Sequence, residues 1–144
     1  MGGRRKSREF ALQILYQIDM SHENARDALT LFWQNFEISE GPREFSERLV
    51  EGVWQYKEEL DGVIEKYSDN WRLKRISKVD RNILRLAIFE FFYCYDIPSN
   101  VTINEAIDLG KKFGSEKSGS FINGILDSVS LGMCENGYRT TERD

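Results

Sequence analysis

Apolar residues recur at spacings of three and four along most of the chain. This spacing puts side chains on one face of an α-helix, so it predicts amphipathic helices that share a core. The first helix is expected over about 7–20, followed by a second over about 23–36 and a turn at 38–42. The inward stripe of the first helix comprises Phe10, Ala11, Ile14, Leu15 and Ile18.

The same pattern continues through the second half of the chain. A third helix is expected over about 43–67, with a break near Tyr56 or Glu58, and a loop follows to about Ser77. A fourth helix, over about 79–95, is apolar on nearly all sides and should therefore lie at the centre of the fold. Further helices are expected over about 102–113 and 118–133, and Thr102 with Glu105 forms the pattern of a capping box. No alternation is long enough for a strand, so the predicted fold class is all-α.

Length and composition favour one folded unit. The 144 residues fit the usual size of a single domain, and the sequence contains no internal repeat, low-complexity segment or composition shift. We therefore expect a single domain over residues 1–144. Within it, residues 1–6 form a basic arm and residues 136–144 a flexible polar tail.

Cysteine usage and hydropathy indicate a cytoplasmic protein. Cys94 and Cys134 form neither a CxxC motif nor a disulfide framework, so reduced thiols are expected. No apolar run approaches the roughly 20 residues that span a bilayer. The N-terminus also lacks the continuous apolar core of a signal peptide. We expect no membrane partner.

Patterns that support catalysis are absent from the sequence. His22 is the single histidine and cannot build a His-rich metal site. The segment 114–120 has the glycine spacing of a phosphate-binding loop, but Ser120 stands where the lysine belongs. Acidic pairs, such as Glu105 with Asp108, fit a solvated helix face. We therefore predict a binding protein with no metal and no cofactor, and not an enzyme.

Charge is unevenly distributed along the chain. Residues 1–8 carry four basic and no acidic side chains, so the other 136 residues carry 16 basic and 24 acidic groups, or −8. Cations at a helix N-terminus oppose the helix dipole, so helix stability does not explain them. They indicate either a polyanion-binding arm or a solubilising tail. Four phosphate contacts on a single strand would give a log–log salt slope of about −3.

Two phenylalanines flank the loop that precedes the last helix. Phe113 and Phe121 lie on either side of it, together with Lys111, Lys112 and Lys117. Aromatic rings beside cations can stack the bases of a single-stranded nucleic acid. Core packing explains the same two positions, because both also fit the apolar stripe.

Several ordered segments together resemble one family. They cover residues 8–16, 80–90, 97–106, 112–114 and 121–127. Their order and spacing, behind a basic arm, resemble the NusB family of transcription antitermination factors across essentially the whole chain. The resemblance implies a compact bundle of about seven helices in two sub-bundles, without catalysis.

The resemblance also implies partners. NusB-like proteins pair with ribosomal protein NusE, and the heterodimer binds single-stranded boxA RNA. Within the transcription elongation complex, this promotes read-through of terminators, especially in ribosomal RNA operons. Some family members form homodimers that hide the RNA surface, and the sequence leaves the oligomeric state open.

Carried over residue by residue, the family pattern assigns two surfaces. Tyr16 and Asp80 would face NusE, with Asp80 offering a carboxylate to a basic group. Lys117 stands where an acidic residue is familiar in the family. The RNA surface would comprise Arg4, Arg5, Lys6 and Arg8 of the arm, extended by Lys112, Glu116, Lys117 and Phe121.

Two other functions remain open at the level of sequence. The same helical fold occurs as the RNA-binding domain of certain ribosomal RNA cytosine methyltransferases, which continue into a catalytic domain with a glycine-rich cofactor loop. This sequence contains no such loop. The other alternative is a protein-interaction scaffold without RNA specificity. Loss of RNA binding on removal of the arm, with partner binding intact, would exclude the scaffold.

Overall fold

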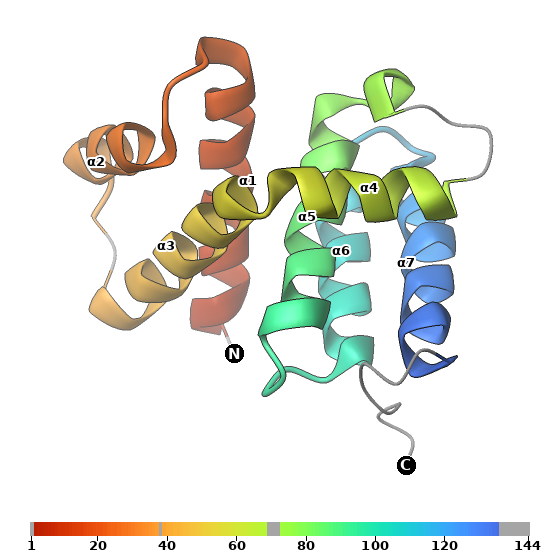
Figure 1. Cartoon of the computed structure of the whole chain (residues 1–144). Coiled ribbons are helices and arrows are strands. Elements are labelled where there is room, and N and C mark those ends of the chain that lie inside the picture. Colours follow the sequence, from red (N-terminus) through yellow and green to blue (C-terminus); the bar gives the residue numbers. More distant parts are fainter. Residues whose placement is uncertain (1, 38, 69–72, 136–144) are drawn as a thin grey trace.

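The computed structural model describes residues 2–37, 39–68 and 73–135. The described residues form α-helices and one short 3-10 helix, with no strand among them, which confirms the predicted all-α class (Figure 1). The predicted tail over 136–144 and the side chain of Cys134 lie outside the described part of the chain. The elements are α1 (Gly2–Ser21), α2 (Ala25–Asn35), α3 (Glu40–Gln55), α4 (Lys57–Tyr67), η1 (Leu73–Arg75), α5 (Lys78–Tyr93), α6 (Ser99–Phe113) and α7 (Ser118–Glu135).

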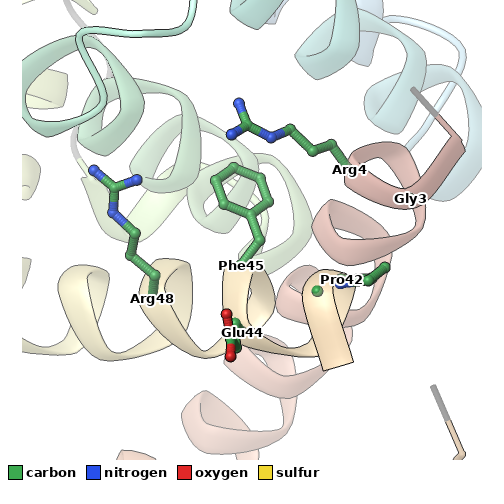
Figure 2. A pocket seen from close by; sticks show the side chains of 7 residues that line it. Gly3, Arg4, Pro42, Glu44, Phe45 and Arg48 are labelled. Carbon is green, nitrogen blue, oxygen red and sulfur yellow. The ribbon is translucent and has the colours of Figure 1, made fainter. Parts of the chain in front are cut away.

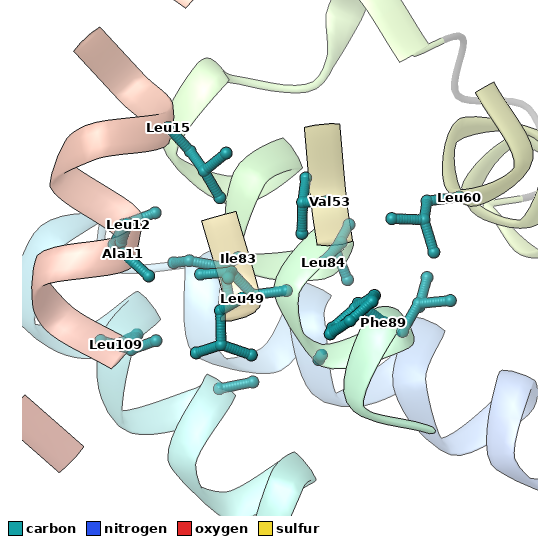
Figure 3. Close-up of a cluster of buried hydrophobic side chains, with 14 of the residues drawn as sticks. Ala11, Leu12, Leu15, Leu49, Val53, Leu60, Ile83, Leu84, Phe89 and Leu109 are labelled. Carbon is teal, nitrogen blue, oxygen red and sulfur yellow. The ribbon is translucent and has the colours of Figure 1, made fainter. Parts of the chain in front are cut away.

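The helices pack as two groups that share α5. Helices α1, α2 and α3 contact one another, and α4, α6 and α7 surround α5 on the other side (Figure 1). Helix α5 also contacts α1 and α3, and an unbroken run of its residues, 82–91, is buried. Figure 3 shows side chains from both groups around this helix, among them Leu49 of α3 and Leu60 of α4. The predicted central position of this helix and the two sub-bundles are confirmed.

Helix α1 begins earlier than predicted. It starts at Gly2 rather than near Ser7, so the described part of the basic arm is helical. Ser7 Oγ lies 2.8 Å from the carbonyl oxygen of Gly3 and 2.7 Å from that of Pro42. Ser46 Oγ donates a hydrogen bond of 2.9 Å to the Ser7 carbonyl. These bonds hold the first turns of α1 against the start of α3, a constraint that helical periodicity does not reveal.

Helix α3 also begins within a predicted turn. It starts at Glu40 and includes Pro42 in its first turn, where a helix has no intrahelical partner for the missing amide hydrogen. Of the two predicted breaks, the structure has the one at Tyr56. There the ring stacks on Tyr93 at a centroid distance of 4.4 Å. One turn earlier, Gly52 lies so close to the Phe89 ring that a Cβ would overlap it.

The predicted capping box is wrong. Helix α6 begins at Ser99, three residues before Thr102, and Pro98 occupies its N-cap position. Thr102 Oγ1 instead donates 2.9 Å to Glu90 Oε1, and Glu105 accepts hydrogen bonds from Arg5. Both side chains are thus used in tertiary contacts with α5 and α1. The end of α6 at Phe113 and the start of α7 at Ser118 agree with the prediction.

The described residues contain neither a membrane-spanning helix nor a metal site. None of their helices has the length and apolar character needed to cross a membrane. No cluster of side chains among them has the composition of a metal site.

Candidate nucleic-acid interface

The first turns of α1 present three cations to solvent. The side chains of Arg4, Arg5 and Lys6 are 43%, 59% and 59% exposed. Arg4 pairs with Asp96 at 3.3 Å, and Lys6 lies 4.0 Å from Glu9. These carboxylates offset the unfavourable placement of cations at a helix N-terminus. The arm is therefore an ordered helical surface in which each cation already has an anionic neighbour.

Arg5 makes the closest of these ion pairs. Its guanidinium donates to both oxygens of Glu105, at 3.2 and 2.7 Å, and its Nη2 lies 3.5 Å from Asp108. The hydrogen bond from Arg5 lowers the pKa of Glu105, although partial burial opposes this change. The same hydrogen bond, together with the negative charge of Glu105, raises the pKa of Arg5. Arg5 thus joins the start of α1 to the middle of α6.

Glu9 connects a cation of the arm to a cation near the end of α6. Its carboxylate lies between two cations, with Lys112 Nζ 3.0 Å from Oε2 and Lys6 Nζ 4.0 Å from Oε1. Lys112 is exposed, and its Nζ lies 5.4 Å from the centroid of the Phe113 ring. Lys6 and Lys112, which are far apart in the sequence, therefore lie on one face.

Arg8 requires a correction. Its side chain is only 5% exposed, and it donates to both oxygens of Glu90, at 2.8 and 2.9 Å. Glu105 lies 3.6 Å away, and Thr102 completes the hydrogen bonding of Glu90. A guanidinium enclosed in this way is not available to a phosphate on the surface. Arg8 was expected in the RNA-binding arm, but the structure makes it part of the interior between α1, α5 and α6.

The connection between α6 and α7 exposes the remaining predicted residues. Glu116 and Lys117 are exposed, and the loop is closed by Ser118 Oγ, which accepts 2.9 Å from the amide of Ser115. Phe121 packs partly against the core. Its exposed part lines a hollow of about 390 Å³ that also includes Tyr67 and Lys66. Phe121 therefore combines the two roles that the sequence left open, core packing and an accessible ring.

The two residues predicted to face a protein partner lie at one end of the bundle. Tyr16 of α1 is 40% exposed. Asp19, almost one turn further along α1, accepts hydrogen bonds from Asn82 at 2.9 Å and Arg81 at 3.4 Å. These bonds join the C-terminal part of α1 to the first turns of α5, where Asp80 lies.

Asp80 has an unsatisfied acceptor. Its amide donates 3.1 Å to Ser77 Oγ, which caps α5. Its Oδ1 atom is buried and has no hydrogen-bond partner among the described residues. A buried carboxylate oxygen without a donor is costly to the folded protein.

Comparison with known proteins decides the family. The sequence model of the NusB family matches residues 5–131 of this chain. The chain belongs to the NusB family. The transcription antitermination protein NusB of Anaeromyxobacter dehalogenans is 53% identical over 131 residues, which cover 90% of this chain and 92% of that relative. Its family and relatives confirm the prediction of a transcription antitermination factor that is not an enzyme.

Solved NusB structures share the fold. NusB from T. maritima superposes with a TM-score of 0.81 at 35% identity, covering 89% of this chain and 90% of that chain. A structure described as antitermination factors NusB and NusE in complex with dsRNA gives a TM-score of 0.82 at 28% identity. It covers 92% of this chain and 98% of that chain. The predicted NusB-like bundle is thereby confirmed.

Sequence reasoning missed the acidic half of this NusB-family surface. Glu9, Glu105 and Asp108 pair with the cations of α1 and α6, yet Glu105 and Asp108 were interpreted as a solvated face. Arg5 and Glu105 are 100 residues apart in the sequence, so no local spacing links them. Only the excess of acidic over basic residues in the body of the chain could have suggested internal partners for the arm.

Proposed function

We propose that the protein binds single-stranded, boxA-type RNA jointly with ribosomal protein NusE. Within the transcription elongation complex it promotes read-through in ribosomal RNA operons. One observation carries the proposal: Lys6 of α1 and Lys112 of α6 are exposed and share Glu9, Arg5 is exposed and pairs with Glu105 of α6, and Arg4 is exposed next to them on the first turn of α1. Family membership supports the role in antitermination.

The proposed RNA contact is an exchange of anions. Arg5 already binds a carboxylate through two N–H groups, and a phosphate offers the same two-point geometry. RNA phosphates would take the place of carboxylates around the exposed cations. Because the carboxylates compete, binding by this protein alone is expected to be weak and strongly dependent on salt.

Base recognition is assigned to the start of α7. Phe121 supplies an aromatic ring at the edge of a hollow, and stacking on such a ring contributes about 1–3 kcal/mol per base. Glu116 and Lys117 lie exposed just before it, where hydrogen bonds to base edges would add sequence preference. Arg8 is left out of this surface because it is buried.

The NusE contact is assigned to Tyr16 and Asp80. An exposed aromatic residue and a carboxylate on the first turn of α5 are suited to a partner that supplies a cation. The solved complex of NusB, NusE and dsRNA, whose NusB-like chain superposes on this one, supports the choice of partner.

Fluorescence anisotropy over a salt series tests the proposal. The RNAs are boxA-like and scrambled single strands, each measured with and without NusE. We expect the boxA-like strand to bind more tightly and NusE to increase this preference. Equal binding to both strands that ignores NusE would contradict the proposal.

A pair of matched variants distinguishes the loss of a specific phosphate contact from the effect of a lower total charge. Arg5→Gln and Arg26→Gln each remove one arginine that is 59% or 57% exposed and paired with a glutamate. Arg26 lies on α2 and pairs with Glu47 and Glu51 of α3 rather than with the acidic residues around the arm. Arg5→Gln is expected to reduce the salt slope by about 0.7, as for one lost phosphate contact, and Arg26→Gln to leave it unchanged.

A further inference from the structure

A hollow of about 470 Å³ lies between the first turn of α1 and the start of α3. Figure 2 shows Arg4 reaching over it from α1, while Phe45 and Arg48 extend from α3 toward the same space. The rim includes Gly3 and Gly41, which leave the main chain accessible. Nothing lies within 4 Å of the position that a Cβ on Gly41 would take, so this rim is open.

Phe45 fixes the position of Arg4. The ring is buried, with the guanidinium carbon of Arg4 at 4.7 Å from its centroid and that of Arg8 at 5.6 Å. Cation–π contacts of this kind favour a defined position of the cation above the ring. Because Arg4 also contacts Asp96, its guanidinium is held in one position at the edge of the hollow.

Arg48 differs from the cations of the arm in its partner. Its Nη2 donates 2.9 Å to the main-chain carbonyl oxygen of Tyr93, a neutral acceptor. Among the residues that the structure describes, no carboxylate lies within 4.0 Å of its guanidinium. A guanidinium has five N–H donors, so most of those of Arg48 stay available for an anion. Its charge is therefore less neutralised than that of Arg4 or Arg5.

The positive charges of Arg4 and Arg48 both affect the pKa values of Asp96 and Cys94. Burial raises the pKa of Asp96, but the hydrogen bond from Arg4 and the charges of Arg4 and Arg48 outweigh it and lower this pKa. Both arginines also oppose the raised pKa of Cys94. The two guanidinium groups therefore border one small region. In Figure 2 Glu44, the acidic residue on the rim, points away from the space between them.

We propose that Arg48 forms, together with Arg4, a further phosphate-binding position, so that the RNA strand continues from the basic arm across α3. This inference rests on the proposed function, because Arg4 belongs to both surfaces. A phosphodiester is compact and accepts planar, two-point hydrogen bonding from a guanidinium. It therefore suits a hollow bordered by two arginines. An acidic peptide, with bulkier and more widely spaced carboxylates, is the alternative outcome of the test.

The experiment compares Arg48→Gln and Arg48→Lys with the wild-type full-length protein. Each is titrated against a boxA-like single strand with NusE present over a salt series. Arg48→Gln is expected to weaken binding roughly threefold to tenfold and to reduce the salt slope by about 0.7. Arg48→Lys keeps the charge and should recover most of the slope. Arg75→Gln is the control, because Arg75 is exposed on η1 and also has no ion pair among the described residues.

The outcomes separate this inference from the proposed function. Wild-type protein that binds no strand would overturn both. If Arg5→Gln reduces the slope but Arg48→Gln leaves it unchanged, the inference fails and the proposed function stands. Equal weakening by Arg75→Gln would show an effect of total charge and would also overturn the inference. Competition for Arg48 by an acidic peptide, with RNA binding unaffected by Arg48→Gln, would assign the hollow to a protein partner instead.

Discussion

Arg8 of α1 and Glu90 of α5 form an ion pair inside the protein, with both carboxylate oxygens within 2.9 Å of the guanidinium. Their side chains are 5% and 2% exposed. A buried pair of this kind is costly to desolvate, but removing one partner is worse, because the other charge is then left alone. The pair therefore fixes how α1 sits against α5.

Arg8→Ala is expected to lower the free energy of unfolding by about 3–5 kcal/mol, because it leaves the Glu90 carboxylate buried without its cation. Urea unfolding followed by circular dichroism measures this. Arg26→Ala, which breaks an exposed pair with Glu51, serves as the control and should cost less than about 1 kcal/mol. A similar small loss for both variants would mean that Arg8 is solvated.

Asp108→Asn is expected to tighten RNA binding about twofold to threefold at low salt. The Asp108 carboxylate lies 3.5 Å from Arg5 and competes with a phosphate for that cation. Anisotropy titration checks this against Asp127→Asn, which removes the same charge from an exposed position on α7. The two variants would behave alike if only total charge mattered. Weaker binding by Asp108→Asn would show that the carboxylate assists the arm rather than competes.

The protein is expected to lose stability between pH 9 and pH 11 through Cys94. Burial raises the pKa of this thiol from 9.0 to about 11. In this interval the unfolded thiol has lost its proton and the folded one has kept it, so unfolding becomes more favourable as pH rises. The loss is at most about 3 kcal/mol. Burial also raises the pKa of Tyr93 to about 12, so this side chain adds to the pH dependence. Measuring the free energy of unfolding against pH for the wild type and for Cys94→Ala separates the contribution of the thiol from that of Tyr93. Identical pH profiles would refute the prediction.

Gly62→Ala is expected to raise the free energy of unfolding by about 1 kcal/mol. Gly62 lies within α4, and nothing lies within 4 Å of the position that its Cβ would occupy. Alanine there gains helix propensity without a clash. The opposite is expected at Gly52, where a Cβ would overlap the Phe89 ring. Thermal unfolding of the two variants should therefore shift in opposite directions.

Helical periodicity was sufficient to predict the core and the order of the helices. The stripe of Phe10, Ala11 and Ile14 is buried, and the helix that is apolar on nearly all sides is central. The break at Tyr56 was one of two predicted positions. Each of these features depends on residues within a few turns of one another, which is the range over which spacing carries information.

Three of the wrong predictions involve partners beyond the neighbouring turns of the same helix. The start of α1 depends on Pro42, 35 residues from Ser7, and Thr102 bonds to Glu90 rather than to its own helix end. The role of Arg8 depends on Glu90, 82 residues away. A basic residue beside three others in the chain looks like part of one arm. Its place on the inward face of α1 becomes clear only once α5 is packed against it.

The first turn of α1 connects the two groups of helices as well as presenting charge. Arg5 contacts Glu105 of α6, Arg4 contacts Asp96 beyond the end of α5, and Gly3 lies close to Pro42 of α3. A protein shortened by residues 1–6 would therefore lose part of the attachment between its two halves together with its exposed cations. Truncation alone would report both effects as one, and weaker RNA binding after it would not identify the groups that touch RNA. Single neutral substitutions at Arg5 and Lys6 remove one cation at a time and leave the other attachments of α1 in place, so they report the contact of each cation more directly.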